Sequence, residues 1–144
     1  MRSLLITGLI LLVASPVHAQ DSLPQFVFGG HHIGEVRPSP EPRTQCKRPP
    51  DGQRQIICAR ETLNGVSFDV GYIYDSENRL TSVGALVDSL GFEPLLQAFT
   101  KRYGQPRALR RGTGHDYAQW QFKEGRLHLT RTGALIVLRF TSAA

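Results

Sequence analysis

The sequence has few of the residues on which common catalytic and metal sites are built. Its 144 residues include two cysteines, one methionine and one tryptophan. Two cysteines without a second close-spaced pair do not match a structural zinc site. No Gly-x-Ser-x-Gly elbow occurs, and the glycines of "RRGTGHD" (110–116) match no phosphate-binding loop. We therefore expect no enzyme activity and no cofactor.

Long apolar runs are also scarce, and the one near the start of the chain is short. The first twenty residues, "MRSLLITGLILLVASPVHAQ", carry one positive charge, then an apolar run from Leu4 to Ala14, then a small-residue exit that ends at Ala19. This is the layout of a secretory signal peptide. The run covers about 11 residues, whereas a membrane span takes about 20. The sequence predicts a signal peptide over 1–19, a periplasmic or secreted chain over 20–144, and no transmembrane segment.

The two cysteines, Cys46 and Cys58, flank the segment "KRPPDGQRQII", which contains a Pro-Pro-Asp-Gly turn. Such a turn would fold the chain back and bring the two side chains together. Because an exported protein meets an oxidising compartment, we predict a disulfide between them. Residues 37–54 are rich in proline and polar residues, a composition typical of disorder. With the disulfide they become a stapled loop at the start of a single domain over 20–144.

Charge is unevenly distributed along the chain. The segment from residue 101 to the end holds nine basic and two acidic residues, whereas 20–100 holds seven basic and ten acidic ones. The densest run, "KRYGQPRALRR", is either a solvated face or a surface for an anionic envelope polymer or an acidic protein. We expect no nucleic-acid binding, because no aromatic stacking platform accompanies the charges. The candidate binding residues are Lys101, Arg102, Arg107, Arg110 and Arg111.

Alternating apolar and polar residues predict strands in the first half of the exported chain. The stretch "GVSFDVGYIY" (65–74) alternates an apolar face with one that carries Ser67 and Asp69. Asn64-Gly65 before it is a typical hairpin turn, so residues 56–63 are the expected antiparallel partner. Residues 79–87 are the expected third strand, in which Gly84 indicates a bulge or a bend.

The strongest helical pattern lies in "FEPLLQAFTKRYGQP" (92–106). Pro94 suits the first turn of a helix, Gly104 suits the position after its last residue, and Ser89 is a candidate N-cap. The apolar residues recur with the spacing of one helix face, at Phe92, Leu95, Leu96, Phe99 and Tyr103.

Three more strands are expected over 117–122, 126–131 and 134–140, with His128 pointing outward from the second of them. The element order is then β-β-β-α-β-β-β. We predict an α+β fold in which one main helix packs on an antiparallel sheet, preceded by the stapled loop. "GGHHIGEVRPSP" precedes its strands much as "LLQAFTKRYGQP" precedes the later ones. A degenerate duplication is therefore an alternative to a unique arrangement.

Several of these strings together resemble a group of small exported bacterial proteins of uncharacterised function. They are "FGG" and "IGE" near the exported start, the two cysteines, "ETLNGVSFDVGYIYDSENRL", and "LLQAFTKRYGQP" followed by a strand with Trp120. The resemblance spans most of residues 26–140 and rests on turns and caps. It implies no catalytic residue, cofactor or substrate. The chain departs from the group by its adjacent His31 and His32 and by its proline-rich loop.

Three histidines, His31, His32 and His115, are the candidate ligands of a metal. Adjacent residues on a strand point to opposite faces, so one ion would take both His31 and His32 only if the backbone turned sharply at Gly29-Gly30. We therefore predict no metal site. The sequence best fits an exported, non-enzymatic binding or interaction protein of unknown partner, which docks an anionic envelope component through its basic C-terminal half. The alternative is a small metal-dependent or hydrolytic enzyme that uses these histidines.

The export prediction has a direct test. When the full sequence is expressed in a bacterium, protein recovered from the periplasm should begin at Gln20 and have the intact mass of residues 20–144. An Ala19→Arg variant should remain unprocessed, because the small residue at the cleavage site is lost. Soluble wild-type protein that keeps the mass of all 144 residues would contradict the prediction.

Overall fold

The computed structural model describes residues 22–37, 55–87 and 90–143. The predicted signal peptide lies outside these ranges, as do Cys46 and nearly all of the predicted stapled loop. The predicted disulfide between Cys46 and Cys58 is therefore not supported by the described residues. The buried apolar residues of the described chain form one connected core.

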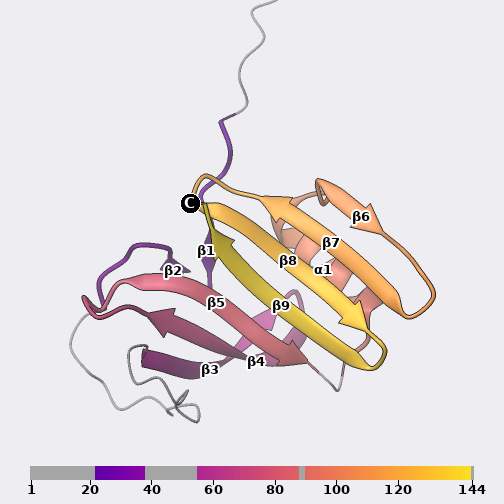
Figure 1. Ribbon diagram of the computed structural model, residues 1–144, viewed down its shortest axis with the longest axis horizontal. Coiled ribbons are helices and arrows are strands. Elements are labelled where there is room, and N and C mark those ends of the chain that lie inside the picture. The colour runs from indigo at the N-terminus through magenta and orange to yellow at the C-terminus, as the bar shows by residue number, and fades with distance from the viewer. Residues whose placement is uncertain (1–21, 38–54, 88–89, 144) are drawn as a thin grey trace, which may run out of the picture.

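Most of the described chain is β-strand (Figure 1). Seven strands form one antiparallel sheet in the order β3-β4-β5-β9-β8-β7-β6. The other described elements are one helix and a two-stranded hairpin. The bounds are β1 Val27–Phe28, β2 His31–His32, β3 Gln55–Leu63, β4 Val66–Tyr74, β5 Leu80–Val87, α1 Phe92–Tyr103, β6 Ala108–Arg110, β7 His115–Gln121, β8 Gly125–Thr132 and β9 Leu135–Ser142.

The predicted α+β class is wrong, because the protein is mostly β and 12% helical. The expected strands and the helix are all present, and three further short strands, β1, β2 and β6, add to them. The hairpin β1–β2 precedes the sheet. β6 lies within the basic run 101–111, whose pattern predicts no strand. β6 has three residues, too few to show an alternating pattern. It is held as an edge strand by its pairing with β7 and by the Arg107 amide, which donates to the Gln119 carbonyl at 2.7 Å.

Two three-stranded meanders meet at the centre of the sheet. The meanders β3-β4-β5 and β7-β8-β9 each follow chain order, and β5 pairs with β9 in the antiparallel sense (Figure 1). The order of these six strands is therefore symmetric about the β5–β9 pair, with Gly84 opposite Arg139. This is the arrangement expected of two degenerate repeats, in which equivalent positions face each other across the centre.

One face of the sheet carries the core, and α1 packs against it. The helix contacts β3 and β4 near one edge of the sheet and β7 and β8 near the other, so the sheet curves around it. Phe99 of α1 is fully buried. Its ring lies 5.7 Å from the Trp120 ring of β7 and 6.1 Å from the Phe28 ring of β1, measured between centroids.

The helix forms where the apolar periodicity predicts it. Its buried side chains are Phe92, Leu95, Leu96, Ala98 and Phe99. The helix ends at Gly104, whose backbone has a φ of 85° and whose amide donates to the Thr100 carbonyl. The N-cap is Gly91, without a side-chain capping bond, and the predicted cap Ser89 lies outside the described residues.

The hairpin β1–β2 covers the part of the inner face that α1 leaves open. Phe26, just before β1, is fully buried and stacks on Phe140 with 4.4 Å between ring centroids. Gly29 and Gly30 form the hairpin turn, both at positive φ, as a two-residue turn of type I′ requires. A Cβ on Gly29 would lie 2.1 Å from the hydroxyl of Tyr72. Glycine at position 29 is thus required by both conformation and space.

The segment after the hairpin pairs with β5 where β5 and β9 separate. β5 pairs with β9 only over residues 84–87. At the start of β5, residues 34–37 take the place of β9: the Gly34 amide donates to the Leu80 carbonyl at 2.8 Å, and the Leu80 amide donates to the Glu35 carbonyl at 2.9 Å. Residues 34–37 therefore form hydrogen bonds with backbone groups of β5 that β9 does not reach.

Candidate binding site

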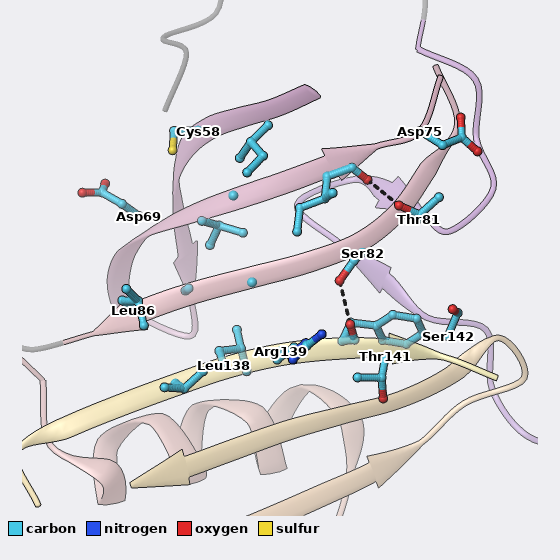
Figure 2. A pocket seen from close by; sticks show the side chains of 18 of the residues that line it. Cys58, Asp69, Asp75, Thr81, Ser82, Leu86, Leu138, Arg139, Thr141 and Ser142 are labelled. Carbon is cyan, nitrogen blue, oxygen red and sulfur yellow. Dashed lines mark hydrogen bonds between the residues drawn. The ribbon is translucent and has the colours of Figure 1, made fainter. Parts of the chain in front are cut away.

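A cavity of about 1310 Å³ lies on the outer face of the sheet, on the side away from α1 (Figure 2). It is lined by residues of β3, β4, β5 and β9. The cavity therefore spans the junction of the two meanders.

One cross-strand row, called here the central row, runs through the middle of the cavity. Residues directly opposite each other on neighbouring strands share a face of the sheet. Val83 and Leu138, which neighbour the row along the strands, are buried in the core, so the central row faces outward. In Cα register the central row reads Cys58, Gly71, Gly84, Arg139, His128 and Gln119.

The floor of the cavity is bare backbone at Gly71 and Gly84. On the other side of the β5–β9 pair, the same row continues with Arg139 and His128. The row therefore lacks side chains only in the first meander, at Gly71 and Gly84. Gly84 is not at a positive φ, and a Cβ there would meet the Leu138 carbonyl oxygen at 3.5 Å, an ordinary contact. The fold therefore does not require glycine at position 84.

The strand irregularity predicted at Gly84 lies a few residues earlier. Ile73 is opposite Ser82 while Tyr74 is opposite Leu80, so Thr81 is the extra residue of a bulge. The Thr81 hydroxyl donates to the Ile73 carbonyl at 3.1 Å. Gly84 is thus left without a role in bending the strand.

Apolar side chains stand on both sides of the glycine floor. Ile73 and its cross-strand partner Ile56 lie on one side, and Leu86 with its partner Val137 lies on the other. Each is two positions from the central row, about 7 Å along the strands. Leu86 is 72% exposed, which is high for a leucine in the middle of a sheet.

The second meander gives the outer face its positive charge. His128 lies opposite Arg139 and two positions from Arg126 on the same face. Within β6 to β9 the only acidic residue is Asp116, which is buried and paired with Arg131. Arg139 is exposed, and its side chain has no hydrogen bond or ion pair within the described part of the chain. Partial burial and the charges of Arg126 and Arg139 lower the pKa of His128.

Hydrogen bonds on both ring nitrogens fix the orientation of His128. Its Nδ1 lies 3.1 Å from the Tyr117 hydroxyl, which itself donates to Oε1 of Gln119. Nδ1 is therefore the donor of that pair, and Nε2 lies 3.1 Å from the Thr141 hydroxyl, which also lies 3.5 Å from the Arg126 carbonyl oxygen. A neutral imidazole held in this way places no competing charge between the two guanidiniums.

Two carboxylates line the far rim of the cavity, and both have partners. Asp69 accepts from Arg60 at 3.2 Å, and Asp75 accepts from the amides of Glu77 and Arg79 at 2.9 Å. Asp69 lies on β4, two strands from β9, which is a separation of about 10 Å. The β9 end of the cavity therefore carries a guanidinium without an ion pair in the described chain, whereas at the opposite rim the Asp69 carboxylate is paired with Arg60.

The basic residues predicted as one binding run are separated in the structure. Lys101 and Arg102 lie in the last turn of α1, whereas Arg111 donates to Glu93 in the first turn at 2.6 Å. Glu93 and Arg102 are nine residues apart in the helix, which is about 13 Å along its axis at about 1.5 Å per residue. The run is thus divided between opposite ends of the helix, and Arg111 is already paired.

The remaining two predicted basic residues lie at the β6 edge. Arg107 precedes the strand, and Arg110 pairs in register with Tyr117, so it shares the outer face with His128. Only Arg110 of the predicted five therefore belongs to the positive outer face. The structure adds Arg126 and Arg139 to this face. Their charge is evident from the sequence, but their position beside His128 is not.

The adjacent histidines share one carboxylate. His31 Nδ1 lies 2.5 Å from Oε1 of Glu35, and His32 Nδ1 lies 3.1 Å from Oε2 of the same residue. The His31 ring also packs edge-on against Tyr72, with 4.8 Å between centroids. These contacts fix the end of the hairpin.

His115, the third candidate ligand, is exposed at the start of β7. Across residues 22–37, 55–87 and 90–143, no three or more His, Cys, Asp or Glu side chains are placed to hold a metal.

The sequence contains part of the information needed to place Arg126 and Arg139. Strand alternation predicts that positions 126, 128 and 139 point outward. What alternation cannot reveal is that β5 pairs with β9, which brings the glycines of the first half beside Arg139 of the second.

No protein-family model, curated protein or solved structure matches the chain significantly. None of the helices in the described ranges has the length and apolar character needed to cross a membrane.

The electrostatics of the outer face predict how His128 titrates. In an NMR titration its pKa should lie below the ordinary 6.5, because both guanidiniums and partial burial disfavour the imidazolium. Arg126→Gln combined with Arg139→Gln should raise that pKa, whereas Arg60→Gln, at the far edge of the same face, should leave it unchanged. A pKa that does not respond to the double substitution would contradict this picture.

Proposed function

We propose that the protein is an exported, non-enzymatic binding protein that docks an anionic envelope component on the outer face of its sheet. The observation that carries the proposal is the pair of guanidiniums next to His128, Arg126 two residues away on β8 and Arg139 opposite on β9, with no carboxylate on the outward positions of β6 to β9. Like charges gathered without counter-charges favour an anionic partner.

The chemistry of the two arginines suits this role. A guanidinium donates paired hydrogen bonds to carboxylate or phosphate oxygens, and such charge-assisted bonds are about twice as strong as neutral ones. Arg126 is oriented by its own Nε, which donates to Gln121 Oε1 at 3.1 Å. Arg139 has no such partner in the described chain. The site therefore combines one ordered guanidinium with one available for a ligand.

The proposal keeps the basic C-terminal half as the binding region but moves the site within it. Arg126 and Arg139 replace the run from Lys101 to Arg111 as the principal contacts. No observation favours the alternative of a metal-dependent or hydrolytic enzyme, because His31 and His32 bind Glu35 and His115 lies apart from them.

Binding of a fluorescent dextran sulfate, measured by anisotropy, tests the proposal. The affinity should fall between low and moderate salt, since the Debye length is about 10 Å at 0.1 M. Arg126→Gln with Arg139→Gln should weaken binding by about tenfold or more. The matched control, Arg60→Gln with Arg79→Gln, removes the same charge from residues paired with Asp69 and Glu77, and should have little effect.

Two results would overturn the proposal. Equal losses in both double variants would mean that only net charge matters. A loss confined to Lys101→Gln with Arg102→Gln would return the site to the helix end.

A further inference from the structure

The cavity on the outer face has apolar walls as well as a positive end, and together these features specify a ligand more closely. We propose that it binds one acyl-chain anion, with the acid group at Arg139 and the hydrocarbon chain over Gly84 and Gly71. This inference rests on the proposed function, because it uses the same positive site for the head group. We call the glycine floor with its flanking Ile73 and Leu86 the trough.

The dimensions of the trough suit a single chain. From Cys58 to Arg139 the central row crosses three strand spacings, about 14 Å in all. The walls stand about 7 Å along the strands on either side of the floor. The floor is therefore long enough for a short acyl chain that lies across the strands.

The walls supply apolar surface that the fold leaves open. Ile73 lines the cavity with Ile56, and Leu86, at 72% exposed, stands beside Val137. Covering such surface is favourable at about 25 cal/mol per Å². A small polar anion would leave these side chains in water, whereas an acyl chain would cover them.

Charge sets the direction in which the chain lies. Arg139 stands at one end of the floor, backed by Arg126 and the neutral His128. Asp69 lies on β4 beside the opposite end. The Ser82 hydroxyl, which lines the cavity, already donates to the Phe140 carbonyl at 2.7 Å. An acid group is therefore attracted to Arg139, whereas the guanidinium at the far rim, Arg60, is already paired with Asp69.

A ligand in the trough explains why residue 84 is a glycine. Glycine within a strand weakens it and marks close approach of a ligand or another backbone. The described structure places no side chain within ordinary contact of a Cβ at position 84, and only the Leu138 carbonyl is near. A ligand lying on the floor accounts for the absence of a side chain there.

Calorimetric titration with octanoate tests the inference on the full exported chain. Octanoate should bind the wild type, while acetate, which lacks the chain, and 1-octanol, which lacks the charge, should each bind at least about tenfold more weakly. Equal binding of acetate would overturn the role of the trough. Equal binding of 1-octanol would overturn the role of Arg139.

Substitutions then locate the ligand. Gly84→Val fills the floor and should weaken octanoate binding by about tenfold or more, whereas Thr130→Val, which adds the same side chain on the outer face of β8, should leave it unchanged. If Gly84→Val does not fold, Leu86→Ser carries the test, because Leu86 is exposed and its loss spares the core. Undiminished octanoate binding in the folded variant would overturn the inference.

The failures of the two proposals are distinguishable. Gly84→Val leaves both guanidiniums in place and should bind dextran sulfate normally. If the wild type binds dextran sulfate through Arg126 and Arg139 but does not bind octanoate, only the acyl-chain inference is overturned. If dextran sulfate binding is also independent of these arginines, the proposed function is overturned with it.

Discussion

The pairing of β5 with β9 is the constraint on which the rest of the structure depends. Four residues of each strand are in register, from Gly84 opposite Arg139 to Val87 opposite Ile136. This short pairing joins the two meanders into one sheet and so makes a single curved face for α1 and the hairpin. A shift of one residue would exchange the two faces of a strand. The register therefore sets the core on one side and the central row on the other.

The two faces of the sheet differ. The inner face is packed with core side chains, whereas the central row on the outer face has large side chains in only one of the two meanders. On the inner face, Phe26 and Phe99 fill the space left by curvature and are fully buried. On the outer face, the first meander has glycine where the second has Arg139 and His128. The result is a hollow beside a positive group, and the fold does not require the glycine at position 84.

Sequence patterns predicted the local elements well and their assembly poorly. Periodicity located α1 and the six longer strands, since apolar spacing is a local property. It missed the hairpin β1–β2 and the edge strand β6, which are too short to show a period. The class was wrong because a single helix, 12% of the protein, was given the weight of the whole sheet. The predicted basic run is divided by the tertiary structure, because Arg111 pairs with Glu93 in the first turn of α1 while Lys101 and Arg102 lie in its last turn. Likewise, nothing local reveals that Gly84 lies beside Arg139.

The central claim, that an acyl-chain anion lies in the trough on the outer face, is tested most directly by intermolecular NOEs to methyl-labelled protein. With octanoate bound, the terminal methyl of the ligand should give NOEs to Ile73 and Leu86, and the Arg139 guanidinium signals should shift. No NOE is expected to Leu96 of α1, which is buried on the inner face. NOEs to Leu96, or a complex without contacts to Ile73 and Leu86, would contradict it.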